Sequence, residues 1–103
     1  MPESTEVEVS VSEFVALFNQ TLEYAYPSIT ITGELANFRV SKNRWVYFDL
    51  KDENASVKFF GVVYQLPGPL EEGMMLKVRG QPRLHNLYGF SVNILKVQPA
   101  GEG

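Results

Sequence analysis

The chain has 103 residues, of which 45% are hydrophobic and 13% aromatic, so its length and composition suit one domain with a single core. It has no cysteine, which excludes disulfides and thiolate metal sites, and no apolar stretch of membrane-spanning length. The net charge of −3 is uneven, because residues 1–26 hold five acidic residues and no Lys or Arg. Residues 27–99 hold nine basic and six acidic residues, a balance of +3, which predicts a modest, salt-sensitive attraction for polyanions.

Residues 1–9 are expected to form a flexible acidic leader, and they lack the basic and apolar regions of a signal peptide, which favours a cytoplasmic protein. Ser10 and Glu13 have the spacing of a capping box and predict a helix over residues 10–26, which ends before Pro27. A helix packed on the domain core is the simpler interpretation, and a free helix that binds a partner is the alternative. The apolar stripe of this helix consists of Val11, Phe14, Val15, Phe18 and Leu22.

From Ser28 onward apolar and polar residues alternate with a period of two, which is typical of strands. Gly33 indicates a bulge or bend, and Gly80 with Pro82 indicates another bend or an edge. Two prolines in residues 61–73 leave room for at most a short helical turn there. The expected strands lie around Ile29–Leu35, Trp45–Leu50, Ser56–Phe60, Met74–Leu84 and Phe90–Ile94.

One helix followed by five short strands with glycine bends predicts an all-β domain over residues 10–99, with residues 100–103 as the start of a linker. The expected architecture is a five-stranded OB-fold barrel preceded by an α-helix, since a sandwich of this length usually needs seven strands. In such barrels oligonucleotides bind on the face of strands 2 and 3 and at the loops that border it.

Alternation assigns the two faces of the second and third strands. Val46, Phe48 and Leu50 form the uniformly apolar set and should point inward, which turns Trp45, Tyr47 and Asp49 outward. By the same logic the third strand turns Lys58 and Phe60 outward. An exposed aromatic patch of this kind usually marks a binding surface. Two alternatives remain: the helix covers this face, or a strand slips by one residue and exchanges the two sets.

Aromatic rings beside cationic side chains on one sheet face are typical of a surface that binds single-stranded nucleic acid. The rings stack on bases and the cations contact phosphates. Trp45, Tyr47 and Phe60 are the candidate stacking residues. Residues His85 and Tyr88 flank the last turn, which in an OB barrel borders the same groove. The candidate phosphate contacts are Arg39, Lys42, Arg44, Lys58 and Arg83.

No catalytic residue, cofactor or metal is expected in this domain. The single histidine, His85, lies in a turn without a nucleophile–base partnership. The carboxylates Asp49, Asp52 and Glu53 suggest either a Mg²⁺ site or ordinary turn chemistry, and turn chemistry is favoured because Asp49 belongs to a strand.

The chain resembles the N-terminal OB domain of the bacterial exonuclease VII large subunit. The matching segments are SVSEF (10–14), GELANF (33–38), VYFDLKDENASVKF (46–59), GMMLKVRG (73–80) and QPAGEG (98–103). The resemblance implies a domain that binds single-stranded DNA for a nuclease region and for small-subunit docking segments that lie downstream in the family. It also implies DNA contacts at Asn37, Phe38, Arg39 and Tyr47.

The chain departs from the family at its loops. His85 stands where the family often has tyrosine, Tyr88 stands where a basic residue is common, and the turn at residues 41–44 differs from the usual form. Three functions therefore stand side by side: a single-stranded DNA-binding domain, a structural or protein-docking module within the enzyme, and an RNA-binding domain of the anticodon type. The expected partners are single-stranded DNA, the rest of the large subunit and the small subunits, with no membrane.

Overall fold

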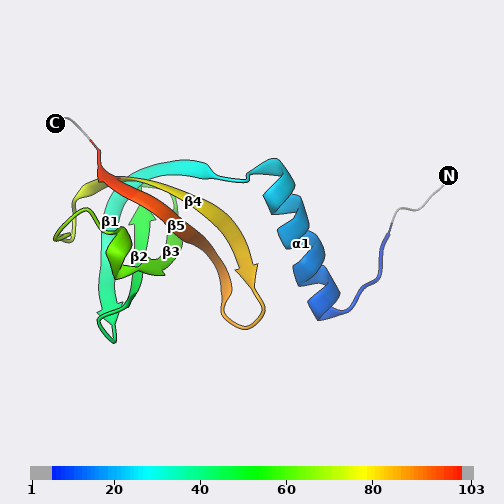
Figure 1. The fold of residues 1–103 in the computed structure, drawn as a ribbon. Coiled ribbons are helices and arrows are strands. Elements are labelled where there is room, and N and C mark those ends of the chain that lie inside the picture. The colour runs from blue at the N-terminus through cyan, green and yellow to red at the C-terminus, as the bar shows by residue number, and fades with distance from the viewer. Residues whose placement is uncertain (1–5, 101–103) are drawn as a thin grey trace.

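The computed structural model describes residues 6–100, which form one helix and five strands in the predicted order (Figure 1). Residues 1–5 of the expected leader and residues 101–103 of the expected linker lie outside the described part. The connection after the third strand holds a single 3₁₀ turn, as its prolines suggested. The elements are α1 (Val11–Ala25), β1 (Ile29–Ser41), β2 (Trp45–Lys51), β3 (Ser56–Val62), η1 (Val63–Gln65), β4 (Met75–His85) and β5 (Gly89–Pro99).

The five strands form one closed sheet in the order β1-β2-β3-β5-β4, with β4 paired back to β1. All pairings are antiparallel except that of β3 with β5. The long strand β1 closes the sheet because it changes partner along its length: Glu34 is paired with Lys51 of β2 on one side and with Met75 of β4 on the other. The prediction of a mostly β domain with one N-terminal helix is confirmed.

The interior of the closed sheet holds the side chains that alternation turned inward. Val46, Phe48 and Leu50 of β2 are buried, and Phe48 stacks on Phe59 of β3 with ring centroids 5.3 Å apart. β2 and β3 are in register, with Tyr47 opposite Phe60. The predicted faces are therefore confirmed, and a slip by one residue is excluded.

Two register shifts bend the sheet. One lies between Arg79 and Gly80, where a bend was predicted, and a Cβ at Gly80 would lie 2.5 Å from the Cγ1 atom of Val92. The other lies in β1 between Ala36 and Arg39, and not at Gly33 where the sequence suggested it. Asn37 supplies the left-handed backbone there, with φ of 55°, a conformation that asparagine adopts more readily than most residues.

The helix α1 begins with the predicted capping box, in which the Glu13 amide donates to Ser10 Oγ and the Ser10 amide donates to Glu13 Oε1. Its packing differs from the prediction. Only Val15 of the stripe is buried, whereas Phe14 and Phe18 keep 51% and 36% of their surface exposed. The sheet closes on itself and fills its interior with strand side chains, so the helix lies beside the sheet and contacts β4 (Figure 1).

One pair of hydrogen bonds ties this helix to the sheet. The Asn19 amide nitrogen donates to the Leu84 carbonyl at 2.9 Å, and the Leu84 amide donates to Asn19 Oδ1 at 2.7 Å. Because Leu84 lies at the end of β4, the helix is joined to the β4–β5 hairpin. Within residues 6–100 no helix has the length and apolar composition that a membrane span requires.

Candidate nucleic-acid interface

Three aromatic rings form a row on the outer face of β2 and β3. Phe60 lies between the other two, with its centroid 5.6 Å from that of Trp45 and 5.3 Å from that of Tyr47. The rings are half-buried because they lean on one another, so they present a fixed apolar surface and not three independent side chains. We call Trp45, Phe60 and Tyr47 the ring row.

A guanidinium group lies over each end of the ring row. The Arg39 Cζ atom is 4.3 Å from the centre of the Tyr47 ring, and the Arg44 Cζ atom is 4.7 Å from the centre of the Trp45 ring. These are cation–π distances, which hold the positive charges beside the rings. A strand whose bases stack on the row would bring its phosphates within reach of these groups.

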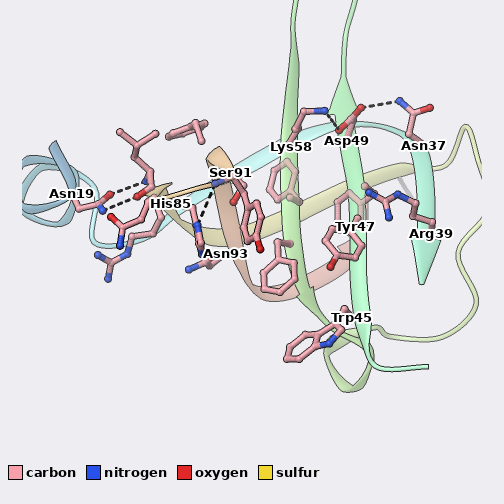
Figure 2. A pocket seen from close by; sticks show the side chains of 18 residues that line it. Asn19, Asn37, Arg39, Trp45, Tyr47, Asp49, Lys58, His85, Ser91 and Asn93 are labelled. Carbon is pink, nitrogen blue, oxygen red and sulfur yellow. Dashed lines mark hydrogen bonds and ion pairs between the residues drawn. The ribbon is translucent and has the colours of Figure 1, made fainter. Parts of the chain in front are cut away.

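The ring row forms one wall of a groove with a volume of about 930 Å³ (Figure 2). Arg39, Lys58 and Arg83 line the groove, whereas Asp49 is the one acidic residue among its lining residues. The groove is therefore positive even though the whole chain carries a charge of −3. A volume near the upper end of the usual range for ligand pockets suits an extended polymer segment better than one small molecule.

The β4–β5 hairpin forms the opposite end of the groove. The rings of His85 and Tyr88 stack there at 4.6 Å, and the amides of Leu87 and Tyr88 donate to His85 Nδ1 at 3.1 and 3.3 Å. These bonds make His85 an organiser of the turn. The Tyr88 ring is 82% exposed and offers one more stacking surface.

The helix lies at the hairpin end of the groove, far from the ring row. Figure 2 shows Asn19 at one side of the groove, with Tyr47 and Trp45 at the other. The helix therefore leaves the ring row open. This excludes the alternative in which α1 covers the aromatic face.

A polar corner borders the ring row where β1 bulges. The amides of Asn37 and Phe38 donate to the two carboxylate oxygens of Glu72 at 3.0 and 2.7 Å. The Asn37 side chain in turn donates through Nδ2 to Asp49 Oδ2 at 2.8 Å, and Lys58 Nζ lies 3.9 Å from Asp49 Oδ1 (Figure 2). The bulge thus directs Asn37 into the groove, in line with the role of bulges in re-aiming side chains.

Most of the residues predicted from the sequence come together in this groove. Three do not line it. Phe38 packs on the core beside Phe48, with centroids 6.4 Å apart, and Lys42 lies at the tip of the β1–β2 turn with positive φ. Arg44 follows Lys42 in that turn and reaches only Trp45. The predicted residues that line the groove are Asn37, Arg39, Trp45, Tyr47, Lys58, Phe60, Arg83, His85 and Tyr88.

Sequence reasoning missed several polar lining residues. Alternation already turned Asp49 to the face of Tyr47, but Asp49 was not among the predicted binding residues. Asn19 carried no local signal, because its role depends on a contact between the helix and β4. The groove residues that were not predicted as a site include Asn19, Asp49, Asn86, Ser91 and Asn93.

The groove offers aromatic surfaces and cationic side chains to a ligand. Within the described residues, no three His, Asp or Glu side chains gather as metal ligands do. Asp52 Oδ1 accepts from the amides of Asn54 and Ala55 at 2.8 and 2.9 Å, which is turn chemistry, as the sequence favoured.

Residues 9–98 match the protein family described as an OB-fold nucleic acid binding domain. The chain belongs to this family. A solved structure of a replication protein A heterotrimer bound to ssDNA contains a similar fold, with a TM-score of 0.60 and 12% identity, over 73% of this chain and 58% of that one. At this identity the likeness concerns the fold of the OB domain alone.

The OB domain is also similar to part of several exodeoxyribonuclease 7 large subunits, which confirms the resemblance noted in the sequence. The protein from Rhodopirellula baltica is 26% identical over 104 residues, which cover 97% of this chain and 24% of that protein. The protein from Streptococcus gordonii is 39% identical over 79 residues, which cover 73% of this chain and 18% of that protein. The chain thus spans about a quarter or less of the length of these curated relatives.

Proposed function

We propose that this OB domain binds single-stranded DNA in the groove between the ring row and the β4–β5 hairpin, largely without sequence preference. The observation that carries the proposal is the row of three contacting rings, Trp45, Phe60 and Tyr47. They line a groove that has three basic side chains and one carboxylate. Stacking is tolerant of sequence because every base has a π-face, and it contributes roughly 1–3 kcal/mol per base.

The choice of DNA rests on the relatives, whose name describes an exodeoxyribonuclease. In a protein of their length, the domain would hold DNA for a nuclease region outside this chain, and the rest of the large subunit and the small subunits would be its protein partners. The domain alone is proposed to bind and not to cut, and to need no cofactor.

Protein docking is the competing function. In that case the ring row would pack against another part of a longer protein, as a half-buried apolar surface can. The two functions differ in their dependence on salt. Contacts from three cations to single-stranded DNA release about two counterions in total, so affinity should fall roughly 20-fold between about 50 and 200 mM salt. Apolar docking responds little to salt.

The test is a titration of the chain with oligo-dT at these two salt concentrations, followed by the fluorescence of Trp45, the single tryptophan. Quenching that weakens with salt supports the proposal. Absence of binding at low salt, checked by a second method, would refute it. Competition with oligo-rU then measures the preference for DNA over RNA. Equal affinities for oligo-dT and oligo-rU would contradict the proposal that DNA is the preferred ligand.

A matched pair of variants tests the ring row. Tyr47→Ala removes a ring that lines the groove and should raise Kd by roughly 5- to 150-fold, the equivalent of one base stack. Tyr64→Ala removes a ring that is 90% exposed and lies outside the groove, so it should leave Kd unchanged. Equal effects of the two variants would contradict the proposed position of the DNA.

A further inference from the structure

The polar corner beside the ring row holds a carboxylate that DNA binding through phosphates does not explain. Asp49 lies in a groove that should attract phosphates, and its side chain is only 14% exposed. A partly buried carboxylate in the path of a polyanion opposes binding unless it accepts hydrogen bonds from the ligand. Its surroundings therefore indicate which part of the ligand it meets.

Asp49 retains acceptor capacity in the free protein. Its Oδ2 atom accepts one bond, from Asn37 Nδ2 at 2.8 Å. Its Oδ1 atom faces Lys58 Nζ at 3.9 Å, which is beyond hydrogen-bond length. An ionised carboxylate has about four acceptor positions, so a ligand with hydrogen-bond donors can fill those that remain.

The carboxylate is held in place by a chain of contacts. Glu72 binds the two bulge amides, the bulge directs Asn37 into the groove, and Asn37 holds Asp49. Such support fixes the acceptor before the ligand arrives, which is what a site for recognition needs.

The register places this acceptor next to the ring row. Tyr47 is paired with Phe60, and the next residues along the same face, Asp49 and Lys58, are paired with each other. Two residues along a strand span about 7 Å, so Asp49 is the next side chain beyond the Tyr47 ring on this face. A base stacked on Tyr47 and Phe60 can thus turn its edge toward Asp49.

We propose that Asp49, positioned by Asn37, recognises the donor edge of one base and gives this single position of the groove a preference for guanine. Guanine offers two neighbouring donors, N1–H and the N2 amine, which match a carboxylate. Thymine offers a single donor, N3–H, between the acceptors O2 and O4, so it can make only one such bond and brings a carbonyl oxygen against the carboxylate. The remaining positions stay tolerant of sequence, since they rest on stacking and phosphate contacts. This proposal depends on the DNA-binding function proposed above.

The experiment compares the affinities of oligo-dT probes of about nine nucleotides that carry guanine, hypoxanthine (the base of inosine) or thymine at the central position. Guanine and inosine stack alike and both carry N1–H, but inosine lacks the N2 amine. Since a good bidentate contact discriminates by roughly 5- to 150-fold, the guanine probe should bind at least about 5-fold tighter than the inosine probe. Asp49→Asn should abolish this difference.

Glu53→Gln is the matched control, because it removes one negative charge from the exposed turn outside the groove. It should keep the guanine preference, which would show that a change of net charge alone does not remove that preference. Asn37→Ala tests the support and should reduce the preference without removing a charge. Melting curves of each variant establish that it is folded.

The outcomes separate the two proposals. Equal binding of the guanine and inosine probes by the wild-type chain, with oligo-dT still bound, would overturn the base preference and leave the DNA-binding function intact. A preference that survives in Asp49→Asn would also overturn it. Failure of every probe to bind at low salt would overturn the DNA-binding function and the preference with it.

Discussion

The bulge in β1 depends on one carboxylate, so its removal gives a sharp test of how the groove is built. Glu72 comes from the connection before β4 and accepts from the amides of Asn37 and Phe38 at 3.0 and 2.7 Å. Glu72→Ala leaves both amides without a protein acceptor. The variant therefore loosens the backbone at Asn37, where φ is 55°.

The magnitude follows from these two bonds. A hydrogen bond to a charged group contributes about 1.5–3 kcal/mol, and the pair would contribute twice that if it were buried. Both bonds are exposed, so water replaces part of the loss, and we expect the variant to lose about 1.5–3 kcal/mol of unfolding free energy in all. For a domain of this size the loss lowers Tm by about 6–24 °C.

The neighbouring Glu71→Ala is the control, because it removes an exposed carboxylate of equal charge whose side chain makes no hydrogen bond among the described residues. Thermal melts of both variants, followed by circular dichroism, measure the difference. Equal Tm values for the two variants would refute the view that Glu72 fixes the bulge. A specific loss in Glu72→Ala should be accompanied by a weaker guanine preference, because Asn37 loses its support.

Two further variants test the sheet and the helix. Gly80→Ala places a Cβ 2.5 Å from Val92 Cγ1 and should lower Tm strongly. Gly68→Ala is the control, because its Cβ meets no atom within 4 Å and should leave Tm unchanged. Similar Tm values for the two variants would contradict the close approach at Gly80. Asn19→Ala removes both hydrogen bonds between the helix and Leu84. Amide hydrogen exchange should become faster in α1, while the amides of β2 and β3 stay protected. Unchanged exchange in α1 would show that other contacts hold the helix.

The sequence was sufficient to predict the order of the helix and strands and the inward and outward faces of β2 and β3. The spacing of Ser10 and Glu13 located the start of the helix, since a capping box is a local feature. Alternation placed Phe48 inside and Tyr47 outside, because a strand with one buried face has no other register that buries its apolar residues.

Non-local features were beyond the reach of the sequence. An apolar stripe shows which face of a helix is apolar, but it does not show which part of the molecule packs against that face. The exposure of Phe14 was therefore not predicted. The bulge at Asn37 depends on Glu72, which is 35 residues away in the chain. At the bulge, Asn37 and Phe38 of β1 lie opposite a single residue of β2. This extra residue turns the Phe38 ring onto the core instead of into the groove.

The closed sheet has a consequence for the way the chain folds. β1, β2 and β3 are joined by short turns, so the ring row lies within one meander that forms from local contacts. Closure requires Ile29 of β1 to find Gly80 of β4, and such distant pairing is slow because a long loop must first be ordered. We expect the meander to form first, with its inner side, including Phe48, exposed until β4 and β5 cover it. A nascent chain would therefore be most prone to aggregate at this stage, after the binding face has formed and before the core is sealed.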